Sequence, residues 1–143
     1  MKRILIVGCG GIGSRHLQAL SNLNLEAEIF VVDKSSDSIE KASSIYNVMP
    51  KNNLIKKVAY FNSIDNLDFD IDLAIIATNS NNRKNIIKKI ISKVNVKYFI
   101  LQKVAFQSIN CFEEVIKLFQ KNNSKAWVNC VNRIFPAYIA LKK

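Results

Sequence analysis

The stretch Ile4-Leu5-Ile6-Val7-Gly8-Cys9-Gly10-Gly11-Ile12-Gly13 decides the fold of this chain. It opens with an uninterrupted apolar run, which is typical of a parallel strand buried on both faces. The glycines that follow recur as G-x-G-x-x-G, a spacing that joins such a strand to a helix through a tight turn. When a strand precedes this turn and a helix follows it, the pattern indicates a site for the pyrophosphate of a dinucleotide.

Each glycine of this turn has a separate physical role. Gly8 allows the sharp turn off the strand, Gly10 lets a pyrophosphate approach the backbone, and Gly13 lets the helix pack close to the strand. The helix then presents free amides, including those of Gly11 and Ile12, and the positive end of its dipole to the phosphates. These five residues are therefore candidate cofactor ligands.

An acidic residue ends the next predicted strand, at residues 26–33. Asp33 lies 20 residues beyond Gly13, the separation at which a carboxylate reaches the ribose hydroxyls of adenosine. A second interpretation makes Asp33 the N-cap of the following helix. Because a carboxylate accepts hydrogen bonds from ribose hydroxyls but repels a 2′-phosphate, we expect NAD as the cofactor rather than NADP. Lys34 qualifies this expectation, since a neighbouring cation offsets the repulsion.

Composition limits the chain to about one domain with a sizeable core. It has 143 residues, of which 49% are apolar, enough for a single core. No apolar run reaches the roughly 18 residues that a membrane-spanning helix needs. Lys2 and Arg3 before an apolar run resemble a secretion signal, but the run is shorter than the roughly 7–15 residues of a signal core. We therefore expect no membrane contact.

The cysteines and the single histidine argue against disulfides and metal binding. Cys9, Cys111 and Cys130 are odd in number and far apart, and His16 is the only histidine. Neither a disulfide framework nor a zinc-ligand spacing follows from this set. We expect a cytoplasmic protein without a metal site, in which each cysteine is a small buried apolar residue. We expect His16 to be a packed or half-buried helix residue rather than a catalyst.

Positive charge is concentrated in the second half of the chain. The formal net charge is +10; residues 1–78 carry eight Lys and Arg against nine Asp and Glu, and residues 79–143 carry thirteen against two. Solvated helix faces explain this excess, and attraction of an anionic partner is the alternative. No nucleic-acid motif occurs and the basic residues are not interleaved with aromatics. We therefore expect a phosphorylated cofactor or a nucleotide-linked substrate as partner, and no nucleic acid.

Apolar runs alternate with helical patterns along the whole chain. The runs predict strands at residues 4–7, 26–33, 58–61, 71–77, 98–101 and 126–131. Apolar residues at helical spacing predict helices at residues 12–20, 35–46, 83–93 and 109–121. Ser35 or Ser36 and Ser108 are the expected caps, and the polar segment 47–57 is an expected loop. This alternation is typical of an α/β protein with a doubly wound parallel sheet of about six strands, the Rossmann fold, whose ligand lies at the carboxyl ends of the first and fourth strands.

Four motifs in order resemble the Gfo/Idh/MocA oxidoreductases, which are nicotinamide-dependent dehydrogenases of sugars, inositols and nucleotide sugars. The glycine turn continues into Arg15-His16, as in several branches of that family. Ala77-Thr78-Asn79 resembles the family's Ala-Thr-Pro segment, and Leu101-Gln102-Lys103-Val104-Ala105 its Glu-Lys-Pro segment. Val131-Asn132-Arg133-Ile134-Phe135-Pro136-Ala137-Tyr138 resembles the Asn-Arg-Arg-Phe-x-Pro stretch that enters the second domain.

The resemblance implies roles for particular residues. Thr78 and Asn79 would border the nicotinamide half of the cofactor, and Gln102 would lie beside it. Lys103 would sit next to the nicotinamide and the substrate and assist hydride and proton transfer, which makes it the candidate catalytic residue. Arg133 would lie on the substrate side.

The chain departs from the family pattern at four positions. Asn79 and Val104 replace prolines, Gln102 replaces the glutamate, and Ile134 replaces the second arginine. Lys103 itself is kept. Because Gln102 is uncharged, an ion pair that would position or tune Lys103 is absent.

The resemblance also implies a domain organisation. Family members continue into a second α/β domain that supplies the substrate floor, the main acid/base and usually the oligomer interface. We therefore expect residues 1–124 to form the dinucleotide-binding domain, and residues 125–143 to form its last strand and the lead-in to a substrate domain that this chain lacks. We expect a homo-oligomer that binds dinucleotide without turning over substrate alone. A non-catalytic dinucleotide- or nucleotide-binding regulatory module is the alternative.

Residues 134–141 are densely apolar, and this tail bears on the expected homo-oligomer. Pro136 restricts helix to the end of the tail and suits a first turn. Exposed apolar surface of this kind marks an interaction site. We expect the tail either to fold back on its own sheet or to pack against another copy, with the second favoured.

Overall fold

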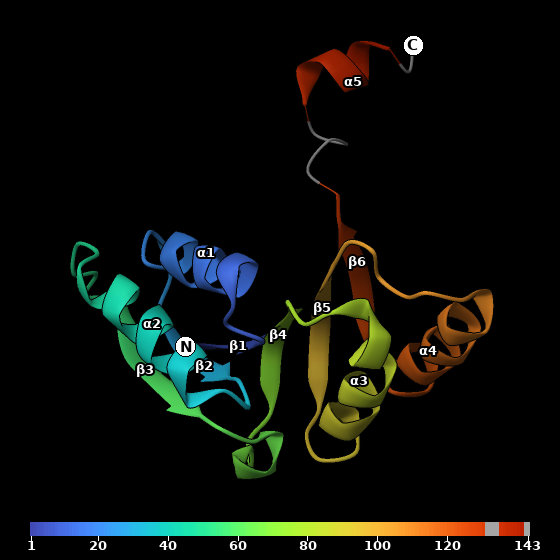
Figure 1. The fold of residues 1–143 in the computed structure, drawn as a ribbon, viewed down its shortest axis with the longest axis horizontal. Coiled ribbons are helices and arrows are strands. Elements are labelled where there is room, and N and C mark those ends of the chain that lie inside the picture. Colours follow the sequence, from blue (N-terminus) through green and yellow to red (C-terminus); the bar gives the residue numbers. More distant parts are fainter. Residues whose placement is uncertain (131–134, 142–143) are drawn as a thin grey trace.

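Six parallel strands form one sheet, and the computed structural model describes the chain over residues 1–130 and 135–141 (Figure 1). The strands are β1 (Lys2–Val7), β2 (Ala27–Val32), β3 (Ile55–Phe61), β4 (Ile71–Ile76), β5 (Val96–Gln102) and β6 (Lys125–Asn129). They lie in the order β3-β2-β1-β4-β5-β6, and every pairing is parallel. The predicted doubly wound parallel sheet is confirmed.

β1 lies inside the sheet because its apolar run can be buried on both faces. Val7 pairs with Val32 of β2 on one side and with Ile76 of β4 on the other. The chain moves outward from β1 to β3 and then returns to β4, so the strand order reverses between β1 and β4. The carboxyl ends of these two strands are the switch point at which open α/β sheets bind ligands, as the sequence predicts.

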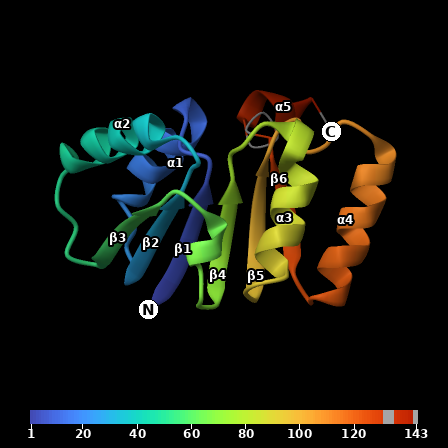
Figure 2. The ribbon, with the colours of Figure 1, turned by 60° about the horizontal axis from the view of Figure 1, so that its bottom comes forward.

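Two helices cover each face of the sheet. They are α1 (Gly11–Leu20), α2 (Ser36–Asn47), α3 (Arg83–Ile91) and α4 (Ile109–Lys121), and the short 3-10 helices η1 (Ile64–Asn66) and η2 (Ser80–Asn82) precede β4 and α3. One core joins α1 and α2 to β1 through Leu17, Ala42 and Ile6. The other joins α3 and α4 to the opposite face through Ile87, Val115 and Leu5. Figure 2 shows α3 and α4 side by side along the sheet.

Local capping chemistry sets where two of the helices begin. The Ser35 hydroxyl accepts a hydrogen bond from the Ser38 N–H at 3.2 Å and caps α2. The Ser108 hydroxyl accepts one from the Cys111 N–H at 3.3 Å and caps α4. Both predicted caps are confirmed.

Four strands begin earlier than the sequence predicts, among them β1, at Lys2 rather than Ile4, and β6, at Lys125 rather than Ala126. β3 starts at Ile55 rather than Val58, so the predicted loop 47–57 is three residues too long at its end, and β5 starts at Val96 rather than Tyr98. β3 is an edge strand, and its Lys56 side chain is exposed. The beginning of this strand therefore has the polarity of a loop, and pairing with β2 makes it a strand.

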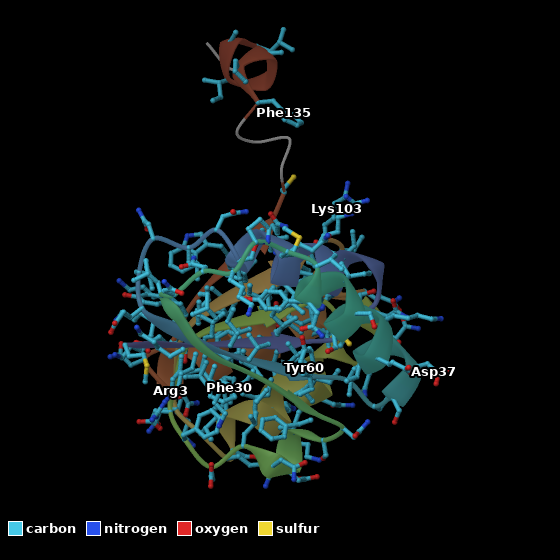
Figure 3. The ribbon with its side chains drawn as sticks, turned by 90° about the vertical axis from the view of Figure 1, so that its left-hand side faces the viewer. Arg3, Phe30, Asp37, Tyr60, Lys103 and Phe135 are labelled. Carbon is cyan, nitrogen blue, oxygen red and sulfur yellow. The ribbon has the colours of Figure 1, made fainter. Side chains whose placement is uncertain are left out.

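A short helix, α5 (Pro136–Ala140), follows in the second described part of the chain. Pro136 occupies its first turn, as the sequence predicts. Phe135, Ile139 and Leu141 are exposed, and Figure 3 shows the Phe135 side chain. Within residues 1–130 and 135–141, no helix has both the length and the apolar character needed to cross a membrane.

Candidate functional site

The three motif glycines have different environments. Gly8 has a φ of +88°, a left-handed conformation that glycine adopts without strain. A Cβ atom on Gly13 would lie 1.8 Å from the Gly8 carbonyl oxygen, so only glycine lets α1 approach the turn this closely. A Cβ atom on Gly10 would meet no atom within 4 Å. The fold itself therefore requires Gly8 and Gly13, whereas the surface above Gly10 is open.

The first turn of α1 presents backbone amides at this open surface. A hydrogen bond from the Ser14 N–H to the Gly10 carbonyl, at 2.9 Å, is the first of the helix. The amides of Gly11, Ile12 and Gly13 precede it and have no acceptor within the helix. The Ile12 side chain is 56% exposed. Free amides at the positive end of a helix dipole form a site for an anion.

The Asp33 carboxylate lies against the glycine turn. Its Oδ2 accepts a hydrogen bond from the Cys9 N–H at 2.8 Å, and its Oδ1 accepts one from the Ser35 N–H at 3.0 Å. Because Ser35 is the N-cap of α2, the interpretation of Asp33 as that cap is wrong. Each carboxylate oxygen keeps a second lone pair that can accept from a hydroxyl group. Lys34 is exposed beside it.

The Cys9 thiol next to Asp33 is buried. Burial, followed by the Asp33 carboxylate, raises the pKa of Cys9 to about 12. The thiol therefore stays protonated at neutral pH and packs as a small apolar residue, as the sequence predicts. Cys111 and Cys130 are free and only partly buried.

Thr78 and Asn79 follow β4 at the other side of the switch point. The Ala77 N–H donates to the Val7 carbonyl at 2.8 Å, so the pairing of β1 and β4 continues to this point. Thr78 packs against the glycine turn, and a Cβ on Gly8 would lie 3.0 Å from its Cγ2. Its Oγ1 is buried and has no hydrogen-bond partner in the described parts of the chain. The Asn79 side chain is exposed.

Gln102 is the last residue of β5 and contacts α1. Its Nε2 donates to the Nε2 of His16 at 2.5 Å, which requires this ring nitrogen to be unprotonated. Burial lowers the pKa of His16, which agrees with a neutral ring. His16 is half-buried on α1, as predicted, and its contact joins α1 to the segment that carries Lys103. The Lys103 side chain is exposed (Figure 3).

Arg83 is a residue of this site that sequence reasoning missed. The sequence predicts it only as the start of a basic amphipathic helix. In the structure its side chain is 2% exposed and donates to the carbonyl of Thr78 after β4 and of Gln102 at the end of β5. No signal in the sequence separates Arg83 from the exposed basic residues of the same helix.

The predicted site residues come together from four strand ends. Each lies at the carboxyl end of a strand: the glycine turn after β1, Asp33 after β2, Thr78-Asn79 after β4, and Gln102-Lys103 at the end of β5. These strand ends share the carboxyl edge of one parallel sheet. Arg133 lies outside the described residues.

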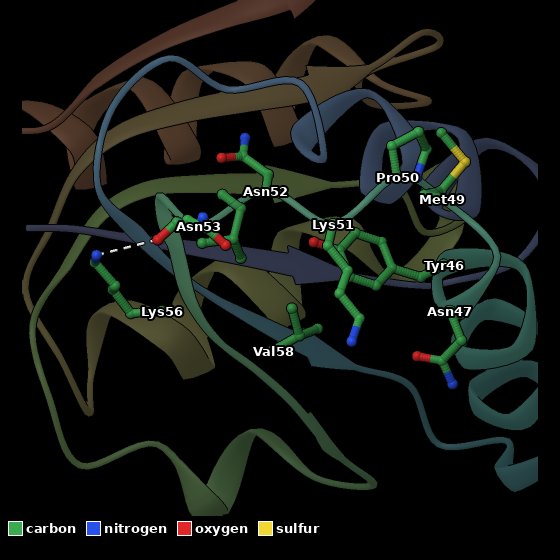
Figure 4. Close-up of a pocket in the computed structure, with 10 residues that line it drawn as sticks. Tyr46, Asn47, Met49, Pro50, Lys51, Asn52, Asn53, Lys56 and Val58 are labelled. Carbon is green, nitrogen blue, oxygen red and sulfur yellow. Dashed lines mark hydrogen bonds between the residues drawn. The ribbon is translucent and has the colours of Figure 1, made fainter.

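Two of the open clefts on the molecule lie at opposite ends of the sheet. One of about 520 Å³ borders the glycine turn, where Gly10 and Arg15 face Lys41 of α2. Another of about 480 Å³ lies at the opposite end of the sheet, where α2 ends and β3 begins (Figure 4). Its lining includes Tyr46 and Met49, and none of the predicted site residues. Only the first cleft adjoins the switch point.

Ion pairs account for much of the positive charge on α3. Lys84 and Lys88 each lie 2.9 Å from a carboxylate oxygen of Glu114 on α4, and hydrogen bonds from Lys88 and Lys84 lower the pKa of Glu114 to about 2. Lys89 and Lys93 pair with Asp65. These contacts favour the interpretation of the charge excess as solvated, paired helix faces.

The family of the chain is decided by a match over nearly its whole length. Residues 2–130 match the model of the Gfo/Idh/MocA oxidoreductases, described as an oxidoreductase family with an NAD-binding Rossmann fold. The chain belongs to the Gfo/Idh/MocA family. No curated protein sequence matches it.

Solved structures of several dehydrogenases share the fold. The WlbA dehydrogenase of Chromobacterium violaceum, solved with NADH and UDP-GlcNAcA, has a TM-score of 0.79 at 20% identity, with 99% of this chain and 38% of that chain covered. The UDP-N-acetylglucosamine 3-dehydrogenase GnnA of Acidithiobacillus ferrooxidans has a TM-score of 0.77 at 16% identity, covering 98% and 40%. The scyllo-inositol dehydrogenase of Lactobacillus casei, solved with NAD(H) and scyllo-inositol, has 0.69 at 17%, covering 99% and 40%. The chain therefore spans about 40% of the length of these structures.

The residues at the switch point fit the cofactor of the Gfo/Idh/MocA family. Open space above Gly10 leaves room for a pyrophosphate next to free amides. The Asp33 carboxylate has free lone pairs for a ribose diol. The buried Thr78 hydroxyl lacks a partner among the described residues, and such groups normally bind water or a ligand.

Proposed function

We propose that this chain is the cofactor-binding domain of an NAD-dependent oxidoreductase that acts on a hydroxyl of a sugar, an inositol or a nucleotide sugar. The observation that carries the proposal is the Asp33 carboxylate, hydrogen-bonded to the Cys9 amide beside an open Gly10. A carboxylate in this place excludes the 2′-phosphate of NADP and selects NAD. When bound, NAD supplies the hydride acceptor.

The proposal assigns each segment a part in binding. The amides from Gly10 to Gly13 hold the pyrophosphate, and Asp33 together with Lys34 contacts the adenosine ribose. Thr78, Asn79 and Gln102 border the nicotinamide half. Lys103, exposed at the end of β5, polarises the reacting hydroxyl or helps to remove its proton. Arg133 contacts the substrate.

The substrate class rests on the relatives. The similar structures contain UDP-GlcNAcA in one case and scyllo-inositol in another, and both are polyhydroxy compounds with a secondary alcohol. Because the chain spans about 40% of these structures, the activity belongs to a longer protein in our proposal. Self-association through the apolar residues of α5 remains a prediction.

A non-catalytic dinucleotide-binding module is the second candidate. Gln102 favours it, because an uncharged side chain that contacts His16 leaves Lys103 without a neighbouring carboxylate at that position. A module of this kind would bind the same cofactor but would not need Lys103.

Calorimetric titration with NADH and NADPH tests the cofactor, and replacement of Lys103 tests the chemistry. We expect NADH to bind more tightly than NADPH. In the protein translated from the entire reading frame, K103M should abolish NADH formation from NAD with inositols or UDP-sugars while NADH affinity changes little. K97M is the matched control, because Lys97 lies on β5, the strand that leads to Lys103, but pairs with Asp72. Full activity of K103M would refute the catalytic role of Lys103, whereas a wild-type protein that binds NADH without forming it from any of these substrates would support the binding-module interpretation.

A further inference from the structure

Arg83 is a buried cation that joins two loops of the site. It is the first residue of α3 and only 2% exposed. Its Nη1 donates to the carbonyl oxygens of Gln102, Val104 and Ala105, and its Nη2 donates to that of Thr78. One guanidinium therefore binds backbone from the segment after β4 and from the segment after β5.

This burial needs an explanation, because no carboxylate within residues 1–130 and 135–141 balances the charge. None of the ion pairs in the described parts of the chain involves Arg83, and its Nε has no partner there. Removing a charge from water is costly unless polar groups replace the hydration. Here four carbonyl dipoles do so. An apolar residue would fill the space at lower cost, so the specific property of arginine at this position is its rigid fork of donors.

Two of the bonded carbonyls belong to the residues immediately before and after Lys103 in the sequence. Gln102 and Val104 are its two neighbours, and both of their carbonyls point at the Arg83 guanidinium. From Lys103 to Gln107 the chain has no regular secondary structure, so no strand or helix fixes this backbone. The guanidinium takes the place of those hydrogen bonds and leaves the Lys103 side chain exposed at the switch point.

We propose that Arg83 is the positioning residue of the site: its buried guanidinium clamps the segment 102–105 to Thr78 and thereby fixes the direction of Lys103 and the nicotinamide side of the cleft. The significance of Lys103 rests on the proposed function, whereas the clamp itself can be tested without any cofactor.

Two variants separate the fork from the charge. R83M keeps an apolar stem but removes all donors, and R83K keeps the positive charge but replaces the fork by one ammonium group. K84M is the matched control, because Lys84 is the next residue of α3 and pairs with Glu114 on α4 instead. It removes the same charge from the same turn without touching the clamped loops.

The first readout is the backbone order parameter from ¹⁵N relaxation, measured on the chain without cofactor. We expect Lys103, Val104 and Ala105 to fall from about 0.85 to below about 0.6 in R83M and R83K, while β1 and K84M stay unchanged. If R83M does not fold, the order parameters of R83K alone test the clamp. Unchanged order in 103–105, or an equal loss of order in β1, would overturn the clamp.

The second readout is the affinity for NADH. We expect R83K to weaken it by about tenfold, the size of one hydrogen bond to a charged group, with K84M unaffected. An R83K chain that loses order at Lys103 but binds NADH as the wild type does would overturn the positioning role. A wild-type chain that binds no NADH would refute the proposed function, and the order parameters would still decide the clamp.

Discussion

Gly10 and Gly13 provide a matched pair of substitutions with opposite expected effects. Gly10 has φ −62° and ψ −163° as the N-cap of α1, which residues with a side chain adopt, and a Cβ there meets nothing within 4 Å. We expect Gly10→Val to change the free energy of unfolding by no more than about 1 kcal/mol. At Gly13 a Cβ would lie 1.8 Å from the Gly8 oxygen. The turn would have to open by about 1 Å, and we expect Gly13→Ala to cost about 3 kcal/mol.

Gly10→Val, which should change stability little, should strongly weaken cofactor binding. A branched side chain above the free amides keeps the pyrophosphate away from them. Losing two hydrogen bonds to a charged group, at about 1.5 kcal/mol each, weakens NADH binding by roughly a hundredfold.

Urea denaturation gives the stabilities, and calorimetry gives the affinities of the same samples. Two results would contradict these expectations: a Gly10→Val chain that is destabilised as much as Gly13→Ala, or one that binds NADH with wild-type affinity. The first result would mean that Gly10 is a packing residue, and the second that the phosphates lie elsewhere.

Further predictions concern three side chains around the turn. Asp33→Ala should reduce the preference for NADH over NADPH in competitive titrations, and an unchanged ratio would contradict the assignment of the ribose site. The single imidazole resonance of His16 should titrate below the ordinary pKa of 6.5, because burial lowers the pKa of His16. The unfolded chain then binds a proton at His16 more readily than the folded chain does, so the contribution of His16 to stability should be present above pH 6.5 and be lost as the pH falls from there through the folded-state pKa. A His16→Phe variant should lack this part of the pH dependence of the unfolding free energy. Equal pH dependence in the two proteins would contradict the prediction. Iodoacetamide should modify Cys111 faster than Cys9 in the folded chain, because burial and Asp33 raise the pKa of Cys9 to about 12, and peptide mass spectrometry showing equal rates would refute this.

Much of the fold is predictable because local patterns and global topology agree. The apolar run before Gly8 is typical of a strand buried inside a parallel sheet, and the alternation of strands and helices then leaves few topologies. The serine caps of α2 and α4 are hydrogen bonds between residues three positions apart, so the local sequence is enough to predict them. The start of β3 is different: Ile55 and Lys56 are strand residues because β2 lies beside them, and no local pattern records that.

The site is predictable only as far as its motifs are local. Along the chain, α1 and β2 separate the glycine turn from Asp33, and the topology fixes their spacing. The contact between His16 and Gln102 joins residues 86 positions apart, and the burial of Arg83 depends on carbonyls from two separate loops. A basic residue at the start of an amphipathic helix has the same appearance in the sequence whether it is solvated or clamped.

In our proposal, a dinucleotide binds across the carboxyl ends of β1, β2, β4 and β5. Mapping of amide chemical shifts in the ¹⁵N-labelled chain during titration with NAD tests it most directly. We predict saturable shifts at Gly10, Gly11, Asp33, Thr78 and Lys103, and none in the cleft lined by Tyr46 and Met49 at the opposite end of the sheet. A folded chain whose amides do not respond to NAD or NADP, or respond only around Tyr46, would show that no dinucleotide binds at this edge of the sheet.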